Sequence, residues 1–199
     1  NRTVARVIRE AIADKPSWRF SAASLIVRDA SRRDEVRTLD LLPAGLELGD
    51  ALADWRRMPA GPRQLLDPTA VIARALGEVV DDYDVVLVDV PGDADLLTVN
   101  GLRMAFGYLL VATPDPEGTA GAERMVSMVA DLDARTGATL APLGVVVNRV
   151  DPDGKLSDRK LRKWLKAKLP LLDARLPDAE PGGEAHRGAS LELAEELLA

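Results

Sequence analysis

Short apolar runs alternate with helical patterns through the second half of the chain. Three runs, at residues 108–113, 143–150 and 171–176, have the length and aliphatic character of buried strands. Between the first two, residues 119–133 carry apolar positions at helical spacing. Repeated strand–helix alternation is typical of a parallel sheet covered by helices on both faces. The sequence therefore predicts an α/β fold, with a predominantly parallel sheet in a three-layer α/β/α arrangement.

The same periodicities predict further elements. Residues 37–43 alternate in polarity and fit a strand, whereas residues 22–27 fit either a helical turn or a short strand. Ser157 is suited to N-cap a helix that runs to about residue 168, ahead of Pro170. Helices are also expected over residues 3–13, 70–80 and 190–198.

A short apolar run at Val85–Val88 ends in Asp89, and Pro91 and Gly92 follow at once. That pattern predicts a strand buried on both faces of a parallel sheet. Ligands of open α/β sheets lie just beyond the carboxyl ends of strands, so Asp89 is a candidate to hold a water of Mg²⁺. The N–H of Gly92 is suited to reach a terminal phosphate oxygen, because only glycine lets the backbone approach that closely. The alternative is a strand-end Asp that caps a turn.

The sequence over residues 89–102 resembles the Walker B and switch II segment of the ParA family of partition ATPases, within the wider ParA/MinD group. The resemblance extends, with gaps, over residues 38–191, and it is most specific at 89–102, 144–151 and Leu176-Pro177. It implies a fold like that of P-loop NTPases, with ATP and Mg²⁺ as cofactors. It also implies a mobile helix over residues 46–55.

Several positions take functional roles from this resemblance. Asp89 would organise Mg²⁺ and the attacking water, and Gly92 would sense the γ-phosphate. Asn148 follows a predicted strand, where its amide is suited to pair with a donor and an acceptor on adenine. The alternative for Asn148 is a side chain that satisfies the loop backbone. Leu176-Pro177 resembles the family's second adenine-binding element, and Asp178 is placed to reach the purine or ribose, although the family often carries Arg there.

The phosphate loop of this family is not found in the 199 residues. Its pattern, G-x-x-x-x-G-K-[ST], supplies backbone N–H groups and a lysine to the phosphates. The only Gly-Lys pair is Gly154-Lys155, with Arg149 in place of the first Gly and Leu156 in place of Ser or Thr. We therefore expect residues 1–199 to be a single ParA-like ATPase domain without its N-terminal strand and phosphate loop, which would lie ahead of Asn1.

Charge is distributed unevenly along the chain. The net charge is −6, but residues 155–168 hold seven basic residues and one acidic residue, a net +6 that leaves −12 elsewhere. Such a cluster favours contact with the phosphates of nucleic acid, although a solvated helix face is the alternative. The predicted contacts with double-stranded DNA, independent of its base sequence, come from Lys155, Arg159, Lys160, Arg162, Lys163 and Lys166.

Composition and the resemblance together predict the cellular setting. Cysteine is absent, which fits a reducing cytosol, and no apolar run is long enough to span a membrane. The resemblance implies a cytoplasmic, nucleoid-associated ATPase for plasmid or chromosome partition. It would form a homodimer with ATP, coat double-stranded DNA, and hydrolyse ATP when stimulated by a ParB-like centromere-binding protein.

Two alternatives stay open. The first is a MinD-like positioning ATPase, whose closing helix would be basic and membrane-binding. Residues 190–198 contain three Glu and no Lys or Arg, which argues against it. The second is a pseudo-ATPase that has lost its phosphate loop and serves as a DNA-binding or adaptor module without hydrolysis.

Overall fold

The computed structural model describes most of the chain, namely residues 2–13, 20–31, 38–59, 67, 69–92, 95–137, 139–151, 170–179 and 183–198. The chain divides into two compact units. The first comprises Asn1–Pro91 and Asp95–Met104, and the second comprises Gly92–Ala94 and Ala105–Ala199.

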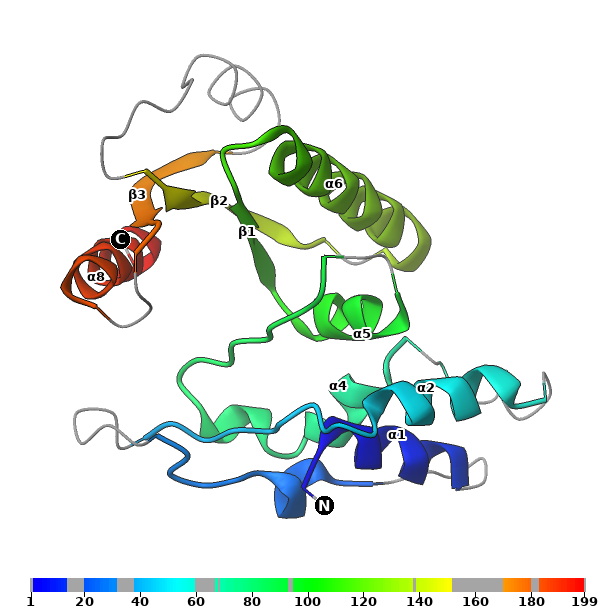
Figure 1. Ribbon diagram of the computed structural model, residues 1–199. Coiled ribbons are helices and arrows are strands. Elements are labelled where there is room, and N and C mark those ends of the chain that lie inside the picture. Colours follow the sequence, from blue (N-terminus) through cyan, green and yellow to red (C-terminus); the bar gives the residue numbers. More distant parts are fainter. Residues whose placement is uncertain are drawn as a thin grey trace. The chain divides into compact units, whose positions relative to one another are not determined.

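The first unit is helical. Its elements are the α-helices α1 (Val4–Ala13), α2 (Leu48–Arg57), α4 (Val71–Leu76) and α5 (Leu96–Met104), and the 3-10 helices η1 (Ala22–Leu25) and η2 (Val80–Asp82) (Figure 1). α1 turns its apolar face inward, where Val7 is fully buried in one core with Leu25 and Trp55. The helices predicted over residues 3–13 and 46–55 are confirmed, and the one predicted over 70–80 ends earlier, at Leu76.

Residues 22–27 contain both of the structures that their sequence allowed. Ala22–Leu25 form η1, and Val27 then pairs with Leu41 in an isolated antiparallel bridge. The N–H of Val27 donates to Leu41 O at 2.8 Å, and the N–H of Leu41 donates to Val27 O at 2.9 Å. In the described part of residues 37–43, the predicted strand is reduced to this bridge.

The segment around Val85–Val88 is the main departure from expectation. It is extended but belongs to no strand, and the side chains of Val85 and Leu87 are 65% and 90% exposed. The prediction of a strand buried on both faces is therefore wrong for this structure. A buried strand needs neighbouring strands and covering helices, and no strand within the described ranges pairs with this segment.

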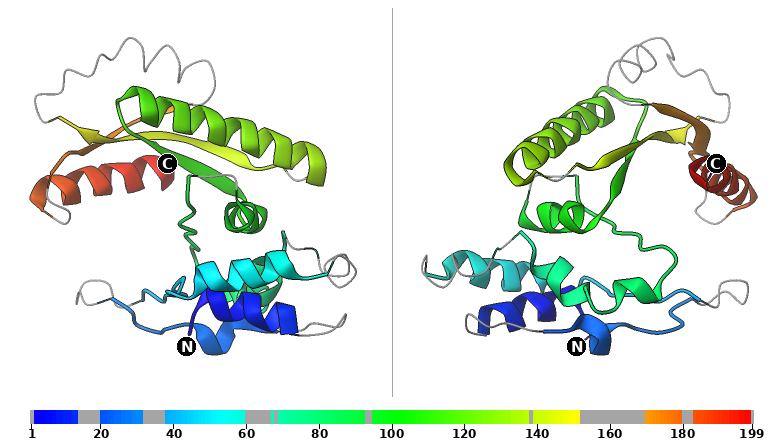
Figure 2. Two further views of the ribbon diagram at one scale, coloured as in Figure 1. Left: turned by 45° about the vertical axis from the view of Figure 1, so that its right-hand side comes forward. Right: turned by 180° about the vertical axis from the view of Figure 1, so that it is seen from behind.

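The second unit is a parallel sheet with helices on both faces. Its elements are β1 (Gly107–Ala112), α6 (Pro116–Thr136), β2 (Ala141–Val150), β3 (Leu171–Pro177) and α8 (Glu184–Leu198). The strands pair in the order β1-β2-β3, and both pairs are parallel. α6 and α8 lie on opposite faces of the sheet (Figure 2). The predicted α/β fold is therefore confirmed, and α8 begins six residues before the expected start.

The connection from β1 through α6 to β2 is fixed by caps and by core packing. Asp115 is the N-cap of α6 and Pro116 its first residue, while Gly137 ends the helix with a φ of 68° in the left-handed region. Val145 and Val147 of β2 are fully buried in a core with side chains of β1 and α6. No helix in the described ranges combines the length and the apolar composition that crossing a membrane requires.

Candidate functional site

The carboxyl ends of β1, β2 and β3 lie along one edge of the sheet, because the strands are parallel. β2 and β3 stay paired to their ends, with Val150 opposite Pro177 and the N–H of Asp178 donating to Val150 O at 2.9 Å. The structure therefore brings Asn148, near the end of β2, and Leu176, near the end of β3, to neighbouring strand ends. This edge is where ligands of open α/β sheets bind.

Asn148 contacts the adjacent backbone near the end of β2. Its Oδ1 accepts a hydrogen bond from the N–H of Arg149 at 2.9 Å. Arg149 has a φ of 57°, in the left-handed region that costs energy for a residue with a side chain, so the Asn148 bond helps to hold this backbone conformation near the end of β2. The amide oxygen thus takes the alternative role considered for this residue. The amide nitrogen donates to no residue that the structure describes, and a base contact through it stays a prediction.

Leu176 and Pro177 are half-buried at the end of β3, and Asp178 is exposed immediately beyond them. An apolar wall followed by a polar group at a strand end suits a flat ring with a polar edge. The adenine and ribose contacts of these three residues stay predictions.

Asp115 is a charged residue at the carboxyl end of β1 that was not among the predicted site residues. Its Oδ1 accepts the N–H of Gly118 at 2.8 Å and so caps α6. Hydrogen bonds from the Gly118 N–H and the Thr113 hydroxyl, with the nearby charge of Arg149, hold the pKa of Asp115 below its usual value of 3.8. The sequence signal for this role is an Asp directly before Pro at a predicted helix start.

In the first unit, the extended segment that carries Asp89 is fixed at both ends. At one end, Tyr83 Oη donates to Asp40 Oδ2 at 2.8 Å, and this hydrogen bond is the main cause that lowers the pKa of Asp40. At the other end, Thr98 Oγ1 donates to Pro91 O at 3.2 Å. Asp89 itself is exposed. Its carboxylate is therefore accessible to a ligand on a segment with two anchored ends.

α5 packs directly against this extended segment. A Cβ on Gly101 would lie 2.4 Å from Val90 Cγ1 and 3.2 Å from Val88 Cγ1, so only glycine allows this approach. Thr98 of the same helix is fully buried, and its N–H donates to Asp95 Oδ1 at 2.9 Å immediately before the helix begins. α5 thus determines where the last residues of the segment lie.

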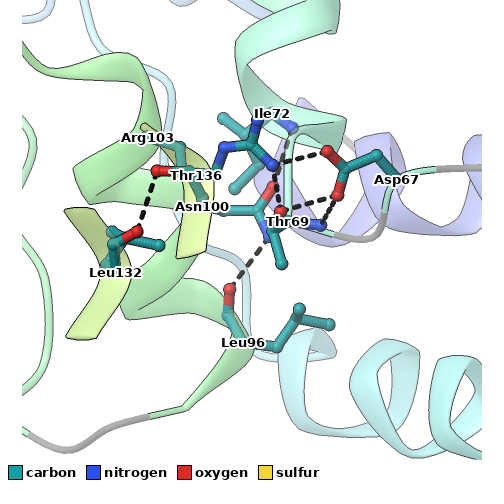
Figure 3. Close-up of polar contacts among 8 residues, drawn as sticks. All are labelled: Asp67, Thr69, Ile72, Leu96, Asn100, Arg103, Leu132 and Thr136. Carbon is teal, nitrogen blue, oxygen red and sulfur yellow. Dashed lines mark hydrogen bonds and ion pairs between the residues drawn. The ribbon is translucent and has the colours of Figure 1, made fainter. Parts of the chain in front are cut away.

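Asn100 ties α5 to α4 (Figure 3). It is only 3% exposed, its Oδ1 accepts the N–H of Ile72 at 3.2 Å, and its Nδ2 donates to Leu96 O at 2.9 Å. A buried amide without such partners would be costly, so these hydrogen bonds fix the approach of the two helices.

Arg103, one turn further along α5, donates to the carboxylate of Asp67 and to the hydroxyl of Thr69 (Figure 3). Burial raises the pKa of Asp67. Hydrogen bonds from the hydroxyl and the N–H of Thr69, and from Arg103, outweigh burial and leave the pKa below its usual value of 3.8. This cluster is a second set of polar contacts between α5 and the residues that lead into α4.

Thr98, Asn100 and Arg103 were not among the predicted site residues. Their signal in the sequence is the occurrence of polar side chains within the apolar stretch 96–104. Buried polar groups require hydrogen-bond partners, so polar residues inside an apolar helical stretch mark contacts between elements. The sequence does not identify those partners.

The residues predicted to contact DNA cannot be placed, because they fall within 152–169, outside the described ranges. Within those ranges, no group of three or more His, Cys, Asp or Glu side chains is arranged to hold a metal ion. A single carboxylate such as Asp89 still fits Mg²⁺, which usually keeps several waters and is held by one or two carboxylates together with nucleotide phosphates.

The family described as AAA domain matches residues 4–141 of the chain, which is more than half of its length. Two curated proteins of Mycobacterium tuberculosis, from strains CDC 1551 / Oshkosh and H37Rv and both described as uncharacterized, are 28% identical over 129 residues. The match covers 63% of this chain and 37% of each relative. The chain thus spans little more than a third of the length of these relatives.

Among solved structures, cobyrinic acid a,c-diamide synthase from Mycobacterium smegmatis, with bound ATP analog and magnesium, is similar to this chain. The TM-score is 0.74 at 26% identity, over 98% of this chain and 71% of that one. Two further likenesses are of fold alone. The apo form of McdA from Cyanothece has a TM-score of 0.65 at 17% identity, over 98% and 71% of the two chains. A chain described as a partition protein has a TM-score of 0.60 at 18% identity, over 82% and 51%.

Proposed function

The chain belongs to the AAA domain family, in the ParA/MinD-type group of P-loop proteins, and we propose that it is part of a ParA-type ATPase for plasmid or chromosome partition. The observation that carries the proposal is the presentation of Asp89. Its carboxylate is exposed on a segment that is anchored at Tyr83 and Pro91 and packed against Gly101. Rigid support of an accessible carboxylate is what positioning of a metal-bound water requires.

In this proposal each site residue has a defined task. Asp89 would hold a water of Mg²⁺, and the Gly92 N–H would donate to a γ-phosphate oxygen. Leu176-Pro177 forms the apolar wall for adenine, with Asn148 and Asp178 at its polar edge. Mg-ATP, when bound, would supply the phosphoryl group for in-line attack by water, and the residues of the chain would contribute mainly positioning and charge stabilisation. The likeness to a structure with bound ATP analog and magnesium supports these two cofactors.

The proposal assigns the phosphate-binding lysine and N–H groups to residues ahead of Asn1. The greater length of the curated relatives is compatible with this assignment. The exposed side chains of Val85 and Leu87 support it too, because a further strand beside them would cover them. Extending the chain upstream should slow amide hydrogen exchange at Val85–Val88. Unchanged exchange would count against the assignment.

The remaining parts of the proposal concern assembly. The intact protein forms a homodimer with ATP, binds double-stranded DNA without sequence preference, and hydrolyses ATP in response to a ParB-like centromere-binding protein. It acts in the cytoplasm on the nucleoid. Likeness in fold to a partition protein and the basic segment 155–168 support these steps.

The decisive experiment measures ATP hydrolysis by the full-length protein, with and without DNA and a centromere-binding partner. Asp89→Ala should abolish stimulated hydrolysis while circular dichroism stays unchanged. Asp84→Ala, which removes an exposed carboxylate from the same segment, is the matched control and should hydrolyse ATP normally. Normal turnover by the Asp89 variant would overturn the assignment of Asp89. Asn148→Ala should weaken ATP binding by about 1–3 kcal/mol, through loss of a base-edge hydrogen bond.

A second candidate function is ATP-dependent amidation. It is favoured by the 26% identity to cobyrinic acid a,c-diamide synthase over 98% of this chain. ATP consumption that depends on cobyrinic acid and an amide donor, with no response to DNA, would favour it over partition. Binding of DNA without hydrolysis would instead indicate a pseudo-ATPase adaptor, and binding to anionic vesicles would indicate a MinD-like protein.

A further inference from the structure

β3 carries an irregularity in the middle of its pairing with β2. Leu171 pairs with Val145 and Arg175 pairs with Val147, so four residue steps of β3 lie against two of β2. β3 is also the last strand in the order of the sheet among the described residues. A bulged edge strand leaves backbone N–H and C=O groups without strand partners, and such groups need other hydrogen bonds.

Two side chains take up the backbone groups of this bulge. The carboxylate of Glu196, in α8, accepts the N–H of Asp173 at 2.7 Å with one oxygen and the N–H of Ala174 at 3.0 Å with the other. Arg175 donates to the carbonyl oxygens of Leu172 and Ala174. One acidic and one basic side chain therefore provide partners for two N–H groups and two carbonyl oxygens of the bulge.

Glu196 is also a principal attachment of α8 to the sheet. Within the described side chains of α8, none is buried, and the half-buried ones follow one helical stripe of His186, Ala189, Leu193 and Glu196. Leu191 is 61% exposed. Because α8 buries little apolar surface, the two charge-assisted hydrogen bonds of Glu196 carry much of its specific contact with β3.

The bulge lies directly before the strand end that holds Leu176-Pro177. β3 pairs with β2 again at Arg175 and, after a second register shift, at Pro177, which lies opposite Val150. The bulge determines how many residues of β3 lie between its paired positions Leu171 and Arg175. It therefore helps to determine which residues of β3 arrive at the carboxyl edge of the sheet, because a change in register displaces every following residue along the partner strand.

We propose that Glu196 is a positioning residue for the nucleotide base: its carboxylate holds the β3 bulge and thereby places Leu176-Pro177 at the base-binding edge. This inference rests on the proposed function, because it assigns a base to that edge. Glu196 does not touch the nucleotide, and the phosphate chemistry lies elsewhere. Loss of the Glu196 carboxylate should therefore weaken binding of the base and leave the rate of the hydrolysis step unchanged.

The test compares Glu196→Gln with Glu195→Gln in the full-length protein. Gln presents only one accepting oxygen, so at least one of the two hydrogen bonds is lost. Glu195 lies beside Glu196 in α8, is exposed, and loses the same charge in its variant. Two quantities are measured: amide hydrogen exchange at Asp173 and Ala174, without nucleotide, and the KM and kcat for ATP and GTP.

Glu196→Gln should speed exchange about tenfold or more at one or both of these amides, as expected for a lost hydrogen bond to a charged group. It should also raise the KM for ATP, reduce the preference for ATP over GTP, and leave kcat within about twofold, because the effect is on binding alone. Glu195→Gln should change neither quantity. Glu196→Asp keeps the carboxylate on a shorter side chain. It should therefore lie between wild type and Glu196→Gln, both in amide exchange and in the KM for ATP.

Each other outcome overturns the inference in a recognisable way. Faster exchange with an unchanged KM and base preference would make Glu196 only an attachment of α8, while the proposed function would stand. Unchanged exchange would show that the carboxylate does not hold the bulge. If the wild-type protein neither binds nor hydrolyses ATP, the proposed function fails, and the base-positioning role of Glu196 fails with it.

Discussion

Thr98 and Asn100 show how single buried polar side chains position a helix. They are 0% and 3% exposed, and each bonds a backbone group of another segment, Thr98 to Pro91 O and Asn100 to the N–H of Ile72. A polar group in the interior is tolerated only with a partner, so each hydrogen bond selects one placement of α5. The placement of α5 in turn determines where the segment that carries Asp89 ends.

Asn100→Ala should lower the free energy of unfolding by about 1–3 kcal/mol, because the part-buried N–H of Ile72 is left without its acceptor. Urea denaturation followed by circular dichroism measures this change. Ser127→Ala removes a hydroxyl that donates to Glu123 O on an exposed face of α6 and serves as control. The control should change stability by less than about 0.5 kcal/mol. Equal effects of the two variants would contradict the role given to Asn100.

Asp67 predicts a dependence of stability on pH. Its pKa in the folded protein lies below 3.8, so the unfolded chain binds more protons near that pH, and the stabilisation by Asp67 is present above pH 3.8. The stabilisation should disappear as the pH falls through the lowered pKa of the folded state. Urea titrations at several pH values should therefore show wild type and Asp67→Asn differing at neutral pH and converging in acid.

Asp131→Asn is the control for this pH dependence, because the pair that Asp131 forms with Arg135, at 3.6 Å, is exposed. Such pairs contribute little to stability at any pH. A difference between wild type and Asp67→Asn that stays constant from neutral to strongly acidic pH would contradict the argument.

At the scale of elements, α5 and the extended segment form one packed unit. The segment has no strand partner within the described ranges, and its apolar side chains at Val85 and Leu87 are exposed, yet Val88 and Val90 contact the position of Gly101. The contact with α5 is therefore what holds the residues just after Asp89. This contact depends on the absence of a side chain at Gly101 of α5.

Gly101→Ala should destabilise the protein by about 1–3 kcal/mol, because the new methyl group would overlap Val90. Alanine is otherwise the better helix former, so the sign of the effect reports packing and not helix propensity. Gly121→Ala in α6 is the matched control, since the added methyl group would meet only the end of Arg124, at 3.7 Å. It should leave stability unchanged or raise it. Thermal unfolding of both variants measures the difference, and destabilisation of both alike would contradict the packing argument.

At the scale of the whole molecule, one segment differs from the rest of the chain in the sign of its net charge. Residues 155–168 carry +6 in a chain of net charge −6. A point charge that meets a DNA phosphate displaces a counterion, so binding through this segment should weaken steeply with salt and carry no base information.

Replacing Lys160 and Lys163 together by Glu should weaken binding to unrelated duplexes alike. It should also flatten the plot of log K against log salt by about 0.9 for each DNA phosphate that the variant no longer neutralises. Fluorescence anisotropy over a salt series measures both effects. The control replaces Arg124 and Arg135, exposed on α6, by Glu and so makes the same change in net charge. Wild-type affinity and slope in the Lys160/Lys163 variant would leave the segment as a solvated helix face.

The α/β character of the second unit could be predicted from the sequence in most respects. Apolar positions recur every 2 residues in strands and every 3.6 residues in helices, and Asp-Pro and Gly mark the two ends of residues 116–136. These signals are local, so they can be recognised without knowledge of the tertiary packing. The edge with Asn148 and Leu176-Pro177 followed from the family resemblance, and the parallel pairing of β2 with β3 brings these residues to neighbouring strand ends.

The succession of strands and helices along the second unit follows from local sequence, because each element depends on residues close together in the chain. The exposed, unpaired state of Val85–Val88 depends on the tertiary fold and could not be predicted from local sequence. The fold had this effect because an apolar run becomes a buried strand only when other segments pair with it and cover it. It also decided that Asn100 meets Ile72 and that Glu196 meets the bulge of β3. These hydrogen bonds join residues more than twenty positions apart, and local sequence carries no information about which distant backbone groups lack a partner.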